Sequence, residues 1–287
     1  MLTHLIAAAG LLLGTATDID HREVPDWINY TLITAGLILA SITALHQLHW
    51  QPIITSLLGL ATGYLLGALM YYTGQWGGGD AKMLMGLGAL LGIPAAYLFG
   101  DAQTPLLIYF LIALVFAGAA YGMLWMLILF IRQRKKVLPA LKNKLSEPWM
   151  HTTRKISITT LLALLVITLV WTNIYLVLIL VLAAISYTTL LLALAVKAIE
   201  ETCFIKQQPV DKLVIGDWIV KDVKKNNQTI IPADNTGLTH QQLQQLKKHD
   251  ITEVTIKEGI PFVPSFLLAY AAAYIWWSSE AGIIFWI

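Results

Sequence analysis

Long runs of apolar residues, separated by short polar segments, dominate this chain. Eight of these runs have about the length of a transmembrane helix, roughly 17 to 25 residues. They are residues 1–17, 27–45, 52–72, 82–99, 105–131, 156–171, 175–196 and 262–277. The pattern predicts an all-α polytopic membrane protein with about eight transmembrane helices.

Two features of this pattern allow a second interpretation. Only Thr172, Asn173 and Ile174 separate the sixth run from the seventh, so a single kinked helix over residues 156–197 is an alternative to two spans. The first run has the position of a secretory signal, but it has no basic start and no small-residue cleavage site. We interpret it as a retained helix.

The one long polar segment, residues 198–261, predicts a small α+β domain inserted before the last helix. Thr239 followed by Gln242 is a capping-box pattern, which predicts that a helix begins there. Strands are expected at 217–223, 228–231 and 251–257, with a turn at 225–227 between the first two. The predicted division is therefore a seven-span transmembrane domain over 1–197, which includes a basic loop at 132–155, the small domain over 198–261, and a last helix over 262–287.

Composition supports the membrane assignment. The chain is 57% hydrophobic and 13% charged, and its mean hydropathy of +0.68 is too high for a water-exposed globular surface. The single cysteine, Cys203, excludes an internal disulfide and a Cys-x-x-Cys zinc site. We expect the lipid bilayer as a partner, and no metal, no cofactor and no nucleic acid.

The basic residues are distributed in a way that predicts the orientation. Short cytoplasmic loops collect Lys and Arg. If the N-terminus is outside, all 19 basic residues lie on the cytoplasmic side, namely Arg22, Lys82, those within 132–155 and those within 197–257. This predicts a multi-pass plasma-membrane protein with both termini outside and the small domain in the cytoplasm. The basic stretch at 132–155 is interpreted as a loop that faces anionic lipid.

Two carboxylates map to this same membrane face. Asp18 follows the first apolar run, and Asp80 ends the sequence Gly-Gly-Gly-Asp just before the fourth. The orientation was assigned from Lys and Arg alone, so this agreement is independent evidence. A charged group at the edge of a membrane helix costs several kcal/mol unless it is paired or hydrated, and such groups are candidates for function.

A pair of aspartates at one depth is suited to peptide hydrolysis. Two close carboxyl groups cannot both ionise at low cost, so they share one proton. The ionised member can then deprotonate a water molecule while the protonated member donates to the scissile carbonyl. The glycines before Asp80 would allow a tight turn and a close approach of a peptide, and the dipole of the following helix would favour ionised Asp80.

On these residues alone other interpretations stay open. Gly-Gly-Gly-Asp is also an ordinary loop with an Asp N-cap, and a transporter could use the same acids. A transporter, however, should have acids near the bilayer midplane and internal repeats, and neither is evident in this sequence. A third interpretation, a membrane scaffold protein, leaves the two acids unexplained. Within the first loop Asp20 competes with Asp18, Asp26 is expected to N-cap the second span, and His21 is expected to be solvated.

The motifs in combination resemble a known family. Gly77 to Lys82 has the form Gly-x-Gly-Asp-x-Lys, and Asp18 begins an Asp-x6-Pro-Asp pattern that ends at Asp26. This resembles the Gly-x-Gly-Asp membrane aspartyl proteases, and within them the archaeal prepilin and preflagellin peptidases of the type IV prepilin peptidase family. The segments 237–239 and 257–264 are also similar to the soluble domain and final span of archaeal members.

The resemblance implies site residues and a substrate. It implies that Asp18 and Asp80 are catalytic, that Gly77 and Gly79 shape the loop, and that Lys82 belongs to the motif. The implied substrates are pilin-like or archaellin precursors with class III signal peptides, cut at the cytoplasmic face. Bacterial members commonly have a cysteine-rich insert and methylate the new N-terminus, and this chain lacks that insert. We therefore expect cleavage without N-methylation.

Overall fold

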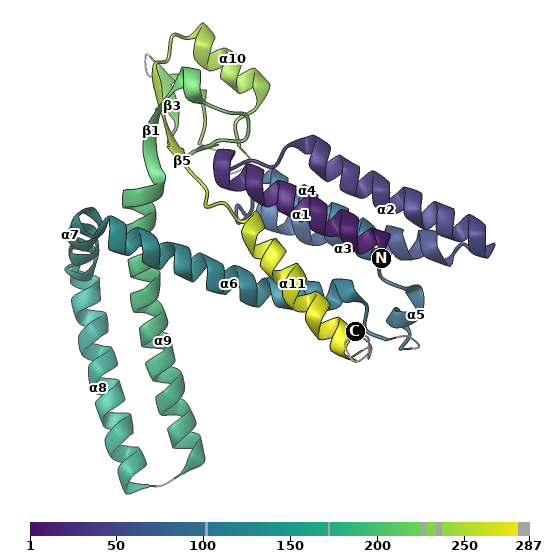
Figure 1. Cartoon of the computed structure of the whole chain (residues 1–287). Coiled ribbons are helices and arrows are strands. Elements are labelled where there is room, and N and C mark those ends of the chain that lie inside the picture. The colour runs from purple at the N-terminus through teal and green to yellow at the C-terminus, as the bar shows by residue number, and fades with distance from the viewer. Residues whose placement is uncertain (101–102, 172, 226–227, 234–236, 281–287) are drawn as a thin grey trace. The chain divides into compact units, whose positions relative to one another are not determined.

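The computed structural model describes the whole chain except residues 101–102, 172, 226–227, 234–236 and 281–287 (Figure 1). The chain forms two compact units. The first consists of residues 1–124 and 207–287, and the second of residues 125–206.

The first unit contains a group of helices with a common apolar core. Buried side chains of the first, second, fourth, sixth and eleventh helices make up this core, among them Leu11, Leu32, Leu87, Phe110 and Phe266. The helices are α1 (Leu2–His21), α2 (Asp26–Gln47), α3 (Gln51–Tyr72), α4 (Gly78–Leu91), α5 (Ala95–Leu98), α6 (Leu106–Arg132), whose last residues belong to the second unit, and α11 (Val263–Glu280).

The predicted number of eight spans is not confirmed. Among the described residues, six helices are long and apolar enough to cross a membrane: α1, α2, α3, α6, α8 and the long helix that begins with α9. The expectation that the fourth span covers 82–99 is wrong. The helix α4 has only 14 residues and ends at Leu91, because Gly92 has a left-handed φ of 65° and Pro94 follows. Fourteen residues extend about 21 Å, which is less than the hydrocarbon thickness of a bilayer.

A row of glycines on α3 holds this short helix. Gly59, Gly63 and Gly67 recur every four residues and face the backbone of α4. A Cβ atom at Gly59 would lie 2.1 Å from the carbonyl oxygen of Gly88, and one at Gly63 would lie 2.5 Å from that of Leu84. Such distances are possible only without side chains, so the two helices pack backbone to backbone, as small residues allow in membranes.

The second unit is mostly helical. It contains the end of α6, followed by α7 (Arg134–Leu145), α8 (Pro148–Val170), α9 (Ile174–Ile199) and a π-helical turn, η1 (Glu200–Phe204). The helices α8 and α9 lie side by side as a hairpin (Figure 1). Residues 156–197 therefore form parts of two helices and not one kinked helix, with residue 172 outside the described part of the chain.

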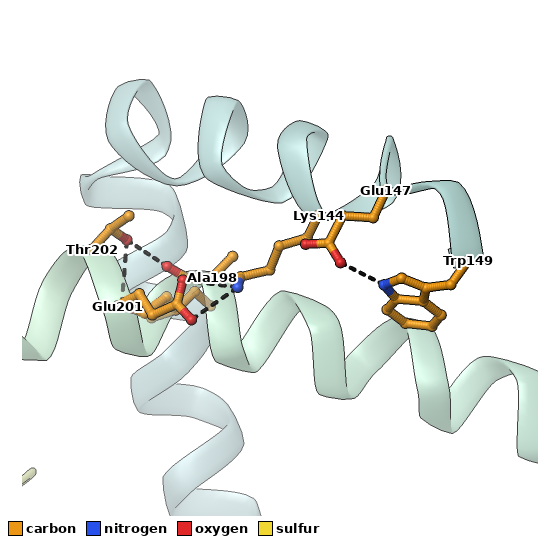
Figure 2. Close-up of polar contacts among 7 residues, drawn as sticks. Lys144, Glu147, Trp149, Ala198, Glu201 and Thr202 are labelled. Atoms are coloured by element: carbon orange, nitrogen blue, oxygen red, sulfur yellow. Dashed lines mark hydrogen bonds and ion pairs between the residues drawn. The ribbon is translucent and has the colours of Figure 1, made fainter. Parts of the chain in front are cut away.

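Polar contacts connect the basic helix α7 and the segment after it to the rest of this unit. The Lys144 ammonium lies 2.8 Å from a carboxylate oxygen of Glu201 in η1, as Figure 2 shows. The indole of Trp149 donates to the carboxylate of Glu147 between α7 and α8. The basic stretch predicted as a loop is thus largely helical, and one of its lysines is paired.

The small sheet-containing region occupies the late part of the chain. Its elements are β1 (Ile205–Pro209), η2 (Val210–Lys212), β2 (Trp218–Ile219), β3 (Val223–Lys225), β4 (Gln228–Ile231), α10 (His240–Lys248) and β5 (Glu253–Lys257). One sheet has the order β1-β5-β2, with β2 antiparallel to β5, and β3 pairs with β4. Buried aliphatic side chains such as Ile231, Leu246 and Val254 form a separate core.

Most expectations for this region are confirmed. The Gln242 amide donates to Thr239 Oγ1 at 3.3 Å, and the Thr239 amide donates to Gln242 Oε1 at 2.8 Å, so the capping box exists. The expected strand over 217–223 is wrong, because it divides into β2 and β3, which belong to different sheets. The expected turn at 225–227 lies partly outside the described residues, and β1 was missed because its Gln-rich sequence lacks a β pattern.

The glycine contact between α3 and α4 generates a stability prediction. We expect Gly59→Ala to lower the free energy of unfolding by about 1 to 3 kcal/mol, because the new methyl group would overlap a backbone carbonyl that cannot move away by rotation. Thermal unfolding in detergent measures this. The matched control is Gly122→Ala on α6, where a Cβ atom meets nothing within 4 Å. An equal melting temperature for the two variants would contradict the backbone contact.

Candidate active site

Asp18 lies near the C-terminal end of α1 and is buried, with 5% of its surface exposed. Its Oδ2 atom accepts a hydrogen bond from the Val263 amide at 2.8 Å, at the first residue of α11. Its carbonyl oxygen accepts from the Arg22 amide at 2.8 Å, and Arg22 ends α1 in the left-handed conformation. The side chain and the backbone of Asp18 are therefore both fixed.

Asp80 lies in the first turn of α4 and is half-buried. Its Oδ2 atom accepts a hydrogen bond from the Gly77 amide at 3.2 Å, so Asp80 caps its own helix. Gly77 has an extended backbone, with φ −70°, whereas the left-handed glycine of this loop is Gly74. Other residues can adopt this backbone conformation, so the conformation of the turn does not require a glycine at position 77.

Packing brings the two aspartate-bearing helix ends together. A Cβ atom at Gly14, one turn before Asp18, would lie 2.5 Å from the Met83 methyl group of α4. A Cβ atom at Gly79 would lie 3.2 Å from Cβ of Val24, in the loop after α1, so this glycine permits a close approach. The structure thus places both residues at the same end of the first unit.

Lys82 has partners in α2. Its ammonium group lies 2.6 Å from Asp26 Oδ1 and 5.6 Å from the centre of the Tyr30 ring. The expectation that Asp26 N-caps α2 is wrong, because Pro25 occupies the N-cap position and the Asp26 side chain pairs with Lys82. The pair joins α2 to α4 two residues after Asp80.

Asn29 is a residue near the site that the sequence did not predict. This residue is fully buried in α2, and its amide donates to the Gly79 carbonyl at 3.3 Å, directly before Asp80. Its Oδ1 atom is buried without a hydrogen-bond partner among the described residues. An asparagine within an apolar run was the available signal, since polar side chains inside membrane helices are uncommon.

The other acids of the first loop differ from Asp18. Asp20 is exposed, as is His21. Partial burial and the negative charge of Asp217 raise the pKa of Glu23, while His21 acts in the opposite direction. Among the residues that the structure describes, no three His, Cys, Asp or Glu side chains are grouped as metal ligands.

The amino-acid sequence is similar to a known family and to several known proteins. Residues 5–135 match the type IV leader peptidase family. The chain is 36% identical over 91 residues to the preflagellin peptidase of Methanococcus maripaludis and 32% identical over 120 residues to that of Methanococcus voltae. These matches cover 32% and 38% of this chain, and 39% and 51% of those relatives. The chain thus spans about half the length of its curated relatives, or less.

The Lys82–Asp26 pair generates a prediction. We expect Lys82→Met to lower the free energy of unfolding by about 0.2 to 1 kcal/mol, because both side chains are partly exposed and solvent weakens their attraction. The exchange Lys82→Asp with Asp26→Lys should recover most of this loss. Thermal unfolding at low and at high salt checks it, because salt should reduce the difference. A loss that the exchange does not recover would contradict the pairing.

Glu23 generates a prediction on pH. Because its pKa is raised above the ordinary 4.5 in the folded protein, the ionised form is disfavoured there, and stability falls as the pH rises through and above this value. Glu23→Gln should therefore melt at a higher temperature than the unmodified chain at pH 7. Near pH 4 both proteins carry an uncharged side chain and should melt alike. A difference that does not vary with pH would contradict the assignment.

Proposed function

We propose that this chain, whose residues 5–135 match the type IV leader peptidase family, is an aspartic endopeptidase with Asp18 and Asp80 as its catalytic pair. The observation that supports the proposal is the position of these two acids at neighbouring ends of α1 and α4, where Gly14 lies against Met83 and Gly79 against Val24. Each accepts a hydrogen bond from a backbone amide.

The proposed mechanism uses one ionised and one protonated aspartate. The ionised carboxylate removes a proton from a water molecule, which attacks the carbonyl carbon of the scissile peptide bond. The protonated partner donates a hydrogen bond to the carbonyl oxygen, and a proton then passes to the leaving amine. The backbone amides of Val263 and Gly77 each donate to an Oδ2 atom, of Asp18 and Asp80 respectively, and so orient the two carboxyl groups.

The proposed substrates are type IV pilin-like or archaellin precursors, which the preflagellin peptidase relatives suggest by name. Their class III signal peptides begin with a short basic leader that lies in the cytoplasm. Arg22 and Lys82 follow the aspartates in the sequence, and the distribution of basic residues supports a cytoplasmic position for this face, with both termini outside. We propose cleavage there without N-methylation.

A transporter is a weaker proposal. Transport sites lie near the bilayer midplane, often at interrupted helices in related halves of the chain. Here Asp18 is in the last turn of α1 and Asp80 in the first turn of α4. Two acids at helix ends favour a site at the membrane edge, where the leader of a precursor meets its apolar helix.

Cleavage of a purified archaellin or pilin precursor by the intact chain in detergent tests the proposal. We expect Asp18→Asn and Asp80→Asn each to reduce the rate by at least about 100-fold, because neither amide can transfer the proton. Asp20→Asn is the matched control, since Asp20 is exposed in the same turn, and it should cleave at the normal rate. Full cleavage by Asp18→Asn or by Asp80→Asn would contradict the proposal. Loss with Asp20→Asn alone would move the first catalytic position by two residues.

A further inference from the structure

The segment that leaves the small sheet-containing region, residues 258–263, lies directly on the candidate site. It follows β5 and leads into α11. We call it the junction. Its last residue, Val263, is fully buried and donates its amide to Asp18 Oδ2 at 2.8 Å. One candidate catalytic carboxylate is therefore held by a residue 245 positions away in the chain.

The same junction touches the loop that carries the second aspartate. The Phe262 ring lies 5.7 Å from that of Trp76, measured between ring centres, and Phe266 of α11 lies 5.3 Å from it. Trp76 directly precedes Gly77, whose amide donates to Asp80. Two consecutive residues of the junction thus contact both sides of the site, one through its amide and the other through its ring.

A third set of contacts fixes the beginning of the junction. The Arg22 guanidinium lies 2.7 Å from Glu258 Oε2, and its Nη1 donates to the Gly259 carbonyl at 3.2 Å. Arg22 is the residue whose amide caps α1 at the Asp18 carbonyl. Both ends of the junction therefore contact the part of α1 that bears Asp18. Glu258 and Gly259 bind Arg22, and Val263 binds Asp18.

We propose that the junction is a positioning element that fixes the position of Asp18 relative to Asp80. The small sheet-containing region, from which the junction leads, would thereby contribute to the geometry of the site. This inference rests on the proposed peptidase function. The amide of Val263 fixes one oxygen of Asp18, while the ring of Phe262 fixes the loop before Asp80. A displacement of the junction changes the relation between the two carboxyl groups without removing either.

The first experiment compares Val263→Pro with Val263→Ala. Both variants lose the valine side chain, but only proline lacks the amide hydrogen. Proline is tolerated in the first turn of a helix, where α11 begins. We expect kcat for cleavage of the precursor to be at least about tenfold lower in Val263→Pro than in Val263→Ala, at similar KM and with the folded fraction measured in each sample. Equal kcat values in the two variants would overturn the proposal.

The second experiment keeps the proposal testable if Val263→Pro does not fold. Arg22→Glu places two acids at the beginning of the junction and should lower kcat about tenfold, and the exchange Arg22→Glu with Glu258→Arg should restore most of it. Failure of the exchange to restore kcat, in protein that melts normally, would overturn the proposal. An unmodified chain that does not cleave the precursor would instead overturn the proposed function itself, and the inference with it.

Discussion

The backbone contact between α3 and α4 is the constraint on which the site depends. The helix α4 is too short to cross a bilayer core alone, and it ends in a left-handed glycine followed by a proline. Its place is set by Gly59, Gly63 and Gly67 of α3, where no side chain would fit. Because α4 begins at Gly78, this packing also determines where Asp80 lies relative to the end of α1.

Backbone amides explain how two acids are tolerated there. A carboxylate that leaves water loses hydration, and hydrogen bonds to its charged form compensate part of that loss. Asp18 receives one such bond from α11 and Asp80 one from its own helix start. Each acid is thus supported by a backbone amide, a group that carries no net charge and does not titrate.

The features that the sequence predicted are those encoded locally. The apolar runs predicted α1, α2, α3 and α6, and the Thr239 capping box predicted the start of α10, because each signal lies within a few residues. The end of α4 was missed because counting apolar residues ignored Gly92 and Pro94, although both are visible helix-ending signals.

Contacts between distant residues could not be predicted in this way. Asp26 looked like an N-cap, and only its distance to Lys82, 56 residues on, shows an ion pair. Asn29 and Val263 act on the aspartate regions through bonds that span 50 and 245 residues. The spacing of apolar residues along the chain does not predict contacts between residues so far apart in the sequence. Asp18 and Asp80 were found because each borders an apolar run, whereas the groups that hold them are ordinary residues in ordinary helices.

The site also extends beyond the part of the chain that carries the family likeness. The match ends at residue 135, and it includes both aspartates, Asn29, Lys82 and the glycines of α3. Val263, Phe262 and Glu258 lie far outside it, yet they contact Asp18, Trp76 and Arg22 within the first unit. A chain that ended with the matched segment would leave the buried Asp18 Oδ2 without the Val263 amide as its donor. The return of the chain through the junction therefore completes a site that the first four helices begin.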